Sequence, residues 1–408
     1  FSNATDKTVA ELYDKLAVAI KAGKVNLPKS SVEASSDTVK INNLTMGNYF
    51  ILIEGGVKVY RPLTANVVPE WKDTKWAMTS PIVEAKASEP VITKVMVDGI
   101  KKDNMNIGDV ISYEITAVVP DYPVNALAKK FVISDKLSKG LTLMDNSLKV
   151  YGVNHGEEAV LLTDGFSKTT QRPANAVNNN DVTFSYDFTY ESIRSYSSIK
   201  IIYNAVLNEE AFIGEGGNIN TAYLDYNNNP YVESSWKTDD DNVVVYTYGL
   251  KVLKGDETTR EGLKGAQFCL EKNGKEILFA GKDGDYHVAK EDENGVSILT
   301  VNSDGEMILK GLDAAEYVLT EEKAPDGYIK LQNPITIKIE DQNLDGKAES
   351  NNKESEDGYI SLTVENDKGF TLPVTGGMGS TVFCLVGVAM VCAGGVLIAT
   401  YFRKKANA

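Results

Sequence analysis

Apolar residues alternate with polar ones in short runs along most of this chain up to residue 366, and turns rich in Gly, Asn and Asp separate the runs. Successive side chains of a strand point to opposite faces, so this period of two predicts strands that each bury one face. In residues 1–88 the predicted strands are 39–41, 49–53 and 57–60, and one amphipathic helix over residues 8–22 precedes them. The pattern predicts a mostly β protein.

The same alternation continues in two longer units. The predicted strands of the first unit are 91–97, 110–118, 131–134, 148–153, 182–190, 198–206 and 220–226. Those of the second unit are 249–253, 266–270, 317–320, 335–339 and 359–364. Many short strands separated by turns are typical of Ig-like β-sandwiches. We therefore expect tandem β domains in a linear rod, over residues 1–88, 89–246 and 247–368.

Composition excludes several classes of function. The chain has 57 acidic and 42 basic residues and a formal charge of −15, which is unfavourable for neutralising nucleic-acid phosphates. It has only two His and three Cys, and Cys384 and Cys392 lie in an apolar C-terminal run, so we expect no disulfide framework and no metal site. Phosphate-loop, zinc-protease and nucleophilic-serine motifs are absent from the sequence. We expect no enzyme, no cofactor and no nucleic-acid partner.

The C-terminus has the pattern of a membrane anchor. Residues 381–402 carry no charge and are numerous enough to cross ~30 Å of hydrocarbon as a helix. The tail over residues 403–408 is basic, and basic residues stay on the cytoplasmic side, so the preceding chain faces outward. Export requires a signal peptide, and the chain starts at Phe1 without Met, so we expect the signal peptide to precede Phe1. We expect the domain over residues 1–88 to lack some of its first residues as well.

A short motif lies in the Gly-rich stalk over residues 369–380, just before the predicted span. Its residues are Leu372, Pro373, Val374, Thr375 and Gly376. The motif, the apolar run and the basic tail, in this order, resemble the LPXTG cell-wall sorting signal of Gram-positive surface proteins. The resemblance implies that a sortase cysteine attacks the Thr375 carbonyl, releases residues 376–408 and passes the acyl group to an amine.

A second motif covers residues 317–328, YVLTEEKAPDGY. It resembles the E-box of CnaB-type domains in Gram-positive pilins and adhesins, with Glu322 where Thr is usual. The resemblance implies an isopeptide bond between a first-strand Lys and a last-strand Asn, here Asn366, with Glu321 as the acid. Residues 250–268 are similar to the first-strand segment of the family. This register favours Lys254, which shares a strand face with Leu250 and Val252, and Lys251 stays the alternative.

The middle unit resembles the isopeptide-forming second domain of fimbrial backbone pilins. The similar segments are residues 90–95, 107–113, 118–120, 131–141 and 217–227. By this resemblance Lys94 is the amine, Asp135 the acid and Asn220 the electrophile. Glu114 is the alternative acid and Asn218 the alternative amide.

A pilin backbone also needs an acceptor lysine. The family carries it after a Trp-containing stretch between the first two domains, and the similar stretch here is residues 67–86. Its spacing is one residue longer than usual, and Glu84 and Ala85 replace a Tyr-Pro pair. Lys86 is the predicted acceptor, with Lys72 and Lys75 as alternatives.

Together the motifs imply the major (backbone) subunit of a sortase-assembled, covalent Gram-positive pilus, anchored to the cell wall at the cell surface. The implied partners are pilin-specific and housekeeping sortases, identical subunits, tip and basal minor pilins, and peptidoglycan. The C-terminal helix would insert into the membrane only transiently. The alternative is a monomeric, wall-anchored adhesin that binds a host ligand, and a functional acceptor lysine separates the two hypotheses.

Overall fold

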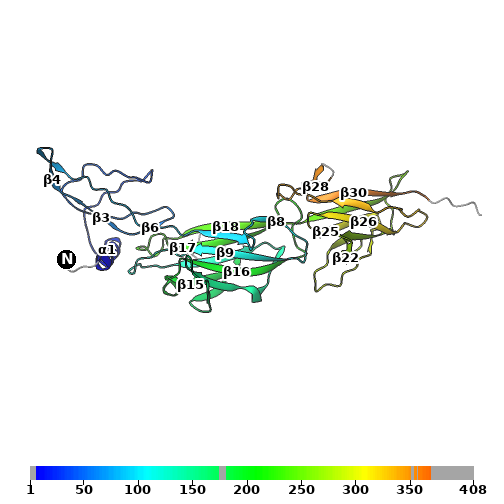
Figure 1. The fold of residues 1–408 in the computed structure, drawn as a ribbon, viewed down its shortest axis with the longest axis horizontal. Coiled ribbons are helices and arrows are strands. Elements are labelled where there is room, and N and C mark those ends of the chain that lie inside the picture. The colour runs from blue at the N-terminus through cyan, green and yellow to red at the C-terminus, as the bar shows by residue number, and fades with distance from the viewer. Residues whose placement is uncertain (1–5, 174–180, 351–352, 356, 369–408) are drawn as a thin grey trace, which may run out of the picture.

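The computed structural model describes residues 6–173, 181–350, 353–355 and 357–368. These residues form β domains that follow one another along an elongated molecule (Figure 1). The predicted stalk with its sorting motif, membrane span and basic tail lie outside the described residues. Within the described residues, no helix is long and apolar enough to cross a membrane.

The first domain combines one helix with small sheets. Its strand pairs are β1–β3, β2–β6 and β4–β5. Its elements are α1 (Asp6–Lys21), β1 (Gly47–Ile51), β2 (Val59–Tyr60), β3 (Leu63–Val67), β4 (Pro69–Lys72), β5 (Lys75–Met78) and β6 (Ala87–Ser88). The helix lies close to its predicted position. The predicted strand 39–41 does not form, because no neighbouring strand pairs with it and Val39 and Ile41 stay exposed.

The middle domain is a sandwich of two sheets, with strand orders β14-β15-β10-β17-β18-β8 and β13-β12-β16-β9-β7. Its first elements are β7 (Ile92–Met96), β8 (Lys102–Asn104), β9 (Val110–Val118), β10 (Phe131–Leu137), β11 (Leu141–Leu143), η1 (Asp145–Ser147) and β12 (Lys149–Val153). The others are β13 (Val160–Leu162), β14 (Phe166–Gln171), β15 (Asp181–Phe188), α2 (Tyr190–Ile193), β16 (Ser198–Leu207), β17 (Asn218–Tyr226) and β18 (Lys237–Tyr246). Every second residue of β9 and β16 is buried between the sheets, as the alternation predicts.

Strand β18 is a feature that the sequence did not predict. Its run of three acids looks like a turn, yet β18 pairs along the whole of β17. The Asp239 carboxylate accepts the backbone N–H of Ile92 at 2.9 Å, and the Asp241 carboxylate accepts that of Lys94 at 2.7 Å. The acids therefore hold edge strand β7 of one sheet against β18 of the other.

The third domain is a second sandwich, with strand orders β22-β23-β25-β19-β30 and β21-β20-β26-β27, where β24 also pairs with β20. Its first strands are β19 (Tyr248–Asp256), β20 (Gln267–Lys272), β21 (Lys275–Glu276), β22 (Phe279–Lys282), β23 (Asp285–Val288) and β24 (Leu299–Thr300). The others are β25 (Glu306–Leu312), β26 (Glu316–Lys323), β27 (Ile335–Lys338), β28 (Ala348–Ser350), β29 (Lys353–Ser355) and β30 (Tyr359–Asn366). First strand β19 and last strand β30 lie side by side and parallel.

The middle and third domains meet in a packed junction. Ile107 is buried, and its N–H donates to the Gly311 carbonyl at 3.0 Å. The Asn104 side-chain oxygen accepts the N–H of Ala314 at 2.7 Å, and that of Asn106 accepts the N–H of Asp313 at 3.1 Å. Gly311 has φ +85°, and a Cβ there would lie 2.5 Å from the Ile107 side chain, so only glycine fits.

Candidate functional site

The third domain brings Lys254, Glu321 and Asn366 together in its core. Lys254 Nζ donates to Asn366 Oδ1 at 2.6 Å and to the Val364 carbonyl at 2.9 Å. Asn366 Nδ2 lies 3.0 Å from Glu321 Oε1 and 3.1 Å from Oε2. At most 3% of any of the three residues is exposed. We call this set the third-domain triad.

Strand geometry places the third-domain triad. In the parallel pair, Lys254 lies opposite Val364 and Asp256 lies opposite Asn366, so Lys254 and Asn366 are two positions apart on one face. Glu321 comes from β26 in the facing sheet, and its Oε2 also accepts the N–H of Leu331 at 2.7 Å. The three side chains therefore converge between the two sheets.

Burial changes the chemistry of the Lys254 amine. It lowers the pKa of Lys254 to about 8, and the nearby Glu321 carboxyl only partly opposes this effect. Neutral amine, the form that can attack a carbonyl, is therefore far more abundant than in an exposed lysine.

The alternative lysine of the same strand faces away from the triad. Lys251 Nζ forms an ion pair with Asp357 at 2.6 Å and lies 4.3 Å from the centroid of the Tyr359 ring. Its side chain is 40% exposed. Lys254 is therefore the lysine of β19 that meets Asn366.

The middle domain brings Lys94, Asp135 and Asn220 together in the same way. Lys94 Nζ donates to Asn220 Oδ1 at 2.6 Å and also contacts the Asp135 carboxylate. None of the three residues is exposed to solvent. Lys94 comes from β7, while Asp135 and Asn220 come from β10 and β17 of the facing sheet. We call this set the middle-domain triad.

Two tyrosines enclose the Lys94 amine. Tyr203 from β16 and Tyr113 from β9 stack with their ring centroids 5.4 Å apart, and Lys94 Nζ lies 5.3 Å from each centroid. The Tyr203 hydroxyl also contacts Lys94 Nζ at 2.7 Å. The sequence predicted the strand that carries Tyr203 but not this contact, because a tyrosine on a buried strand face is an ordinary core residue.

Burial favours the neutral forms of the middle-domain triad. It lowers the pKa of Lys94 to about 8 against the opposing attraction of Asp135. Burial also raises the pKa of Asp135, and the nearby Lys94 opposes that shift. A neutral amine beside a protonated acid is the combination that amide exchange requires.

The two alternatives in the middle domain have other partners. Glu114 forms an ion pair with Lys200 at 2.9 Å on the outer face of the sheet, with its side chain 28% exposed. The Asn218 side chain is buried but binds backbone, donating to the carbonyls of Phe212 and Val245 and accepting the N–H of Phe212. Neither residue reaches Lys94.

The three candidate acceptor lysines are exposed. Lys86 directly precedes β6, where the first domain meets the middle domain, and its carbonyl accepts the N–H of Arg61 at 3.0 Å. Lys72 and Lys75 face each other across the β4–β5 hairpin, next to a Trp71–Trp76 pair whose ring centroids are 5.5 Å apart. Exposure makes all three accessible to an enzyme and does not select one of them.

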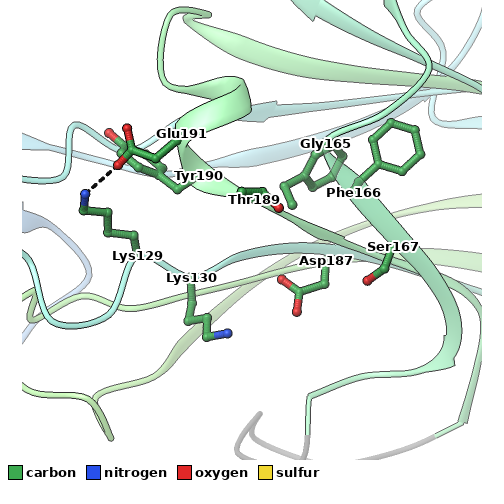
Figure 2. Close-up of a pocket in the computed structure, with 10 residues that line it drawn as sticks. Lys129, Lys130, Gly165, Phe166, Ser167, Asp187, Thr189, Tyr190 and Glu191 are labelled. Atoms are coloured by element: carbon green, nitrogen blue, oxygen red, sulfur yellow. Dashed lines mark hydrogen bonds and ion pairs between the residues drawn. The ribbon is translucent and has the colours of Figure 1, made fainter.

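A separate pocket lies on the middle domain (Figure 2). It encloses about 600 Å³ and is lined by Lys129, Lys130, Gly165, Phe166, Ser167, Asp187, Phe188, Thr189, Tyr190 and Glu191. Figure 2 shows the Lys129 ammonium directed at the Glu191 carboxylate, 2.6 Å away. The Glu191 side chain is 54% exposed, so this pair is an ordinary surface ion pair, and the pocket shares no residue with either triad.

The described residues contain one group of metal-ligating side chains, Cys269, Glu271 and Glu276. Burial, and then the two nearby carboxylates, raise the pKa of the Cys269 thiol to about 11. A metal binds the thiolate, and this environment disfavours the thiolate when no metal is bound.

Family models match the middle and third domains. Residues 107–230 match the family model "Gram-positive pilin backbone subunit 2, Cna-B-like domain". Residues 248–354 match the model SpaA, a prealbumin-like fold domain. The middle domain is therefore similar to a Gram-positive pilin backbone domain and the third domain to a prealbumin-like domain, which confirms the resemblance that their motifs indicated.

A streptococcal surface protein is similar to this chain in sequence. Over 263 residues the chain is 32% identical to the trypsin-resistant surface T6 protein of Streptococcus pyogenes serotype M6. The alignment covers 60% of this chain and 44% of the relative, so the chain spans less than half the length of that protein.

Solved structures show the fold. The T6 backbone pilin of serotype M6 Streptococcus pyogenes, described as a modular three-domain structure, has a TM-score of 0.63 at 22% identity, covering 88% of each chain. The full-length major pilin SpaD from Corynebacterium diphtheriae has a TM-score of 0.50 at 20% identity, covering 80% of this chain and 77% of its own. The prediction of tandem, mostly β domains is confirmed.

Proposed function

We propose that this chain is the structural backbone subunit of a covalently polymerised Gram-positive pilus, stabilised by two intramolecular Lys–Asn isopeptide bonds. The observation that carries the proposal is that two separate sandwiches each bury one Lys, one Asn and one acid within contact distance. Burying unpaired charge is costly, so a core that keeps such a set twice serves a purpose other than packing.

In the third domain, the neutral Lys254 amine attacks the Asn366 carboxamide carbon. The carboxyl of Glu321, which contacts Asn366 Nδ2 through both oxygens, moves a proton from the attacking nitrogen to the departing one. A C–N bond to Nζ forms, the bond to Nδ2 breaks, and ammonia leaves. The middle domain performs the same exchange with Lys94, Asp135 and Asn220.

The subunits are joined by sortase through a second kind of amide. Thr375 of one subunit supplies the acyl group, and Lys86 of the next supplies the amine. The first domain lies at one end of the elongated molecule and the end of β30 at the other (Figure 1). Two different surfaces then meet in each contact, which gives a linear fibre that does not close on itself. The fibre is held at the cell surface, anchored to the wall through the sorting signal.

Immunoblots of surface extracts boiled in SDS test the polymer. We expect a ladder of covalent multimers from the wild-type strain and its loss in Lys86→Ala. Lys72→Ala and Lys75→Ala are matched controls, because both remove an exposed lysine of the same domain, and we expect both to keep the ladder.

Two results of this experiment would contradict the proposal. A ladder that survives Lys86→Ala and disappears with Lys72→Ala or Lys75→Ala would refute Lys86 as the acceptor and leave the polymer intact. A single band from the wild type would refute the polymer and favour the monomeric, wall-anchored adhesin.

A further inference from the structure

The Tyr203 hydroxyl contacts every member of the middle-domain triad. Its oxygen lies 2.7 Å from Lys94 Nζ and 2.8 Å from Asn220 Nδ2, and both nitrogens donate to it. Its own proton is donated to Asp135 Oδ1 at 2.9 Å. The two nitrogens that exchange places during bond formation are therefore linked through one phenol oxygen.

The two triads differ in how the acid reaches the amide. In the third domain Glu321 contacts Asn366 Nδ2 directly. In the middle domain the acid is the shorter Asp135, whose hydrogen bonds among the described residues go to Lys94 and Tyr203 and not to Asn220. The Tyr203 hydroxyl is hydrogen-bonded to both the Asp135 carboxyl and Asn220 Nδ2, and so connects the two groups that make no direct contact.

We propose that Tyr203 is a catalytic residue of bond formation in the middle domain, where its hydroxyl carries a proton from Lys94 Nζ toward Asn220 Nδ2. This inference rests on the proposed isopeptide function. Tyr203 lies wholly inside the core, so bulk water does not replace its hydroxyl in this role.

The proton transfers balance. Nζ of neutral Lys94 bonds to Cγ of Asn220 and becomes positively charged. Protonated Asp135 gives its proton to Tyr203 as Tyr203 gives its own to Nδ2, and the proton that Nζ loses then returns through Tyr203 to Asp135. The Cγ–Nδ2 bond breaks, ammonia leaves, and Tyr203 and Asp135 end in their starting protonation states.

The test is the time course of bond formation in the whole chain after cell-free synthesis. Trypsin cannot cleave after a linked Lys94, so mass spectrometry of digests measures the joined Lys94–Asn220 peptide. We expect Tyr203→Phe, which keeps the ring, to form the bond about 100-fold more slowly. Tyr186→Phe is the matched control, because it removes the hydroxyl of another buried middle-domain tyrosine, on β15, which forms no hydrogen bond with any member of the triad. We expect it to react at the wild-type rate.

A second substitution distinguishes proton transfer by the Tyr203 hydroxyl from a role of Tyr203 in packing alone. Asp135→Glu adds the methylene that lets the carboxyl reach Asn220 Nδ2 directly, so we expect Tyr203→Phe/Asp135→Glu to recover the bond. Near-UV circular dichroism and calorimetry report that the middle domain of each variant folds, and the Lys254–Asn366 bond in the same molecules is the internal reference for the reaction. A wild-type rate in Tyr203→Phe, or no recovery in the double variant, overturns the relay. Absence of the bond from the wild type instead overturns the proposed isopeptide function of the middle domain.

Discussion

At the scale of single residues, burial decides which lysines can react. Lys94 and Lys254 are enclosed in apolar cores, and burial lowers the pKa of each to about 8. At pH 7 roughly a tenth of such amines is neutral, against fewer than about one in a thousand at the ordinary lysine pKa. The exposed Lys251 lacks this environment.

The pKa shift predicts how bond formation depends on pH. A lowered pKa means that the neutral amine accumulates as the pH rises through about 8, so the rate should increase about tenfold per unit below that pH and level off above it. The measurement is the rate of Lys254–Asn366 linkage after synthesis in buffers from pH 6 to pH 9.5. A rate independent of pH over this range would show that amine deprotonation does not limit the reaction.

Part of both triads could be predicted from the sequence and part could not. Strand alternation distinguishes Lys254 from Lys251, because only Lys254 shares a face with Leu250 and Val252. The sequence signals that indicated Asp135 and Asn220 are motif resemblances. Tyr203 carried no local signal, since its role arises from the facing sheet and not from its neighbours in sequence.

At the scale of elements, the two triads differ in how the strands that carry their lysine and asparagine are arranged. Lys254 and Asn366 lie on adjacent parallel strands of one sheet, whereas Lys94 and Asn220 lie on facing sheets. Strand β30 is an edge strand, held on one side only by β19. The proposed covalent bond would fix the last strand of the domain to the first.

The bond at β30 should stabilise the third domain. Lys254 and Asn366 are 112 residues apart, and closing a loop of this length contributes about 4–5 kcal/mol by the chain-entropy estimate. We expect Asn366→Ala to melt on the order of 15 °C lower in calorimetry and to be cut sooner by trypsin. Lys251→Ala removes an exposed ion pair and a contact with the Tyr359 ring, and it should change the melting temperature far less. Equal melting of Asn366→Ala and wild type would contradict the stabilising bond.

The structure explains why the β4–β5 hairpin and strand β18 were not predicted from the sequence. The β4–β5 hairpin turns through Asp73 and Thr74, both at positive φ, where Asn-Gly is the usual signal of such a turn. Strand β18 contains Asp239, Asp240 and Asp241, which a local pattern assigns to a loop. Asp239 and Asp241 accept backbone N–H groups of β7, and Asp241 also pairs with Lys101.

At the scale of the whole molecule, the proposed bonds shorten the covalent path through a fibre. Tension between Lys86 and Thr375 would pass from Lys94 directly to Asn220, and from Lys254 directly to Asn366. The loops closed by these bonds then lie outside the covalent load path, and the packed junction joins Ile107 of one loop to Gly311 of the other. The domain over residues 1–85 also lies outside this path.

Single-molecule force spectroscopy tests this path. With the chain held at residues 86 and 368, we expect no unfolding step from the middle domain of the wild type. In Asn220→Ala the 126-residue separation between Lys94 and position 220 becomes extensible, which should release about 400 Å. A step of that length in the wild type would mean that the bond does not carry the load.

The most direct test of the central claim is the intact mass of the purified wild-type chain, measured beside Glu321→Ala and Asp135→Ala. We expect the wild type to be lighter than its sequence mass by two molecules of ammonia. Each acid variant should lack one of these losses, and Lys251→Ala should keep both. A wild-type mass equal to the sequence mass would contradict the claim that the buried triads become isopeptide bonds.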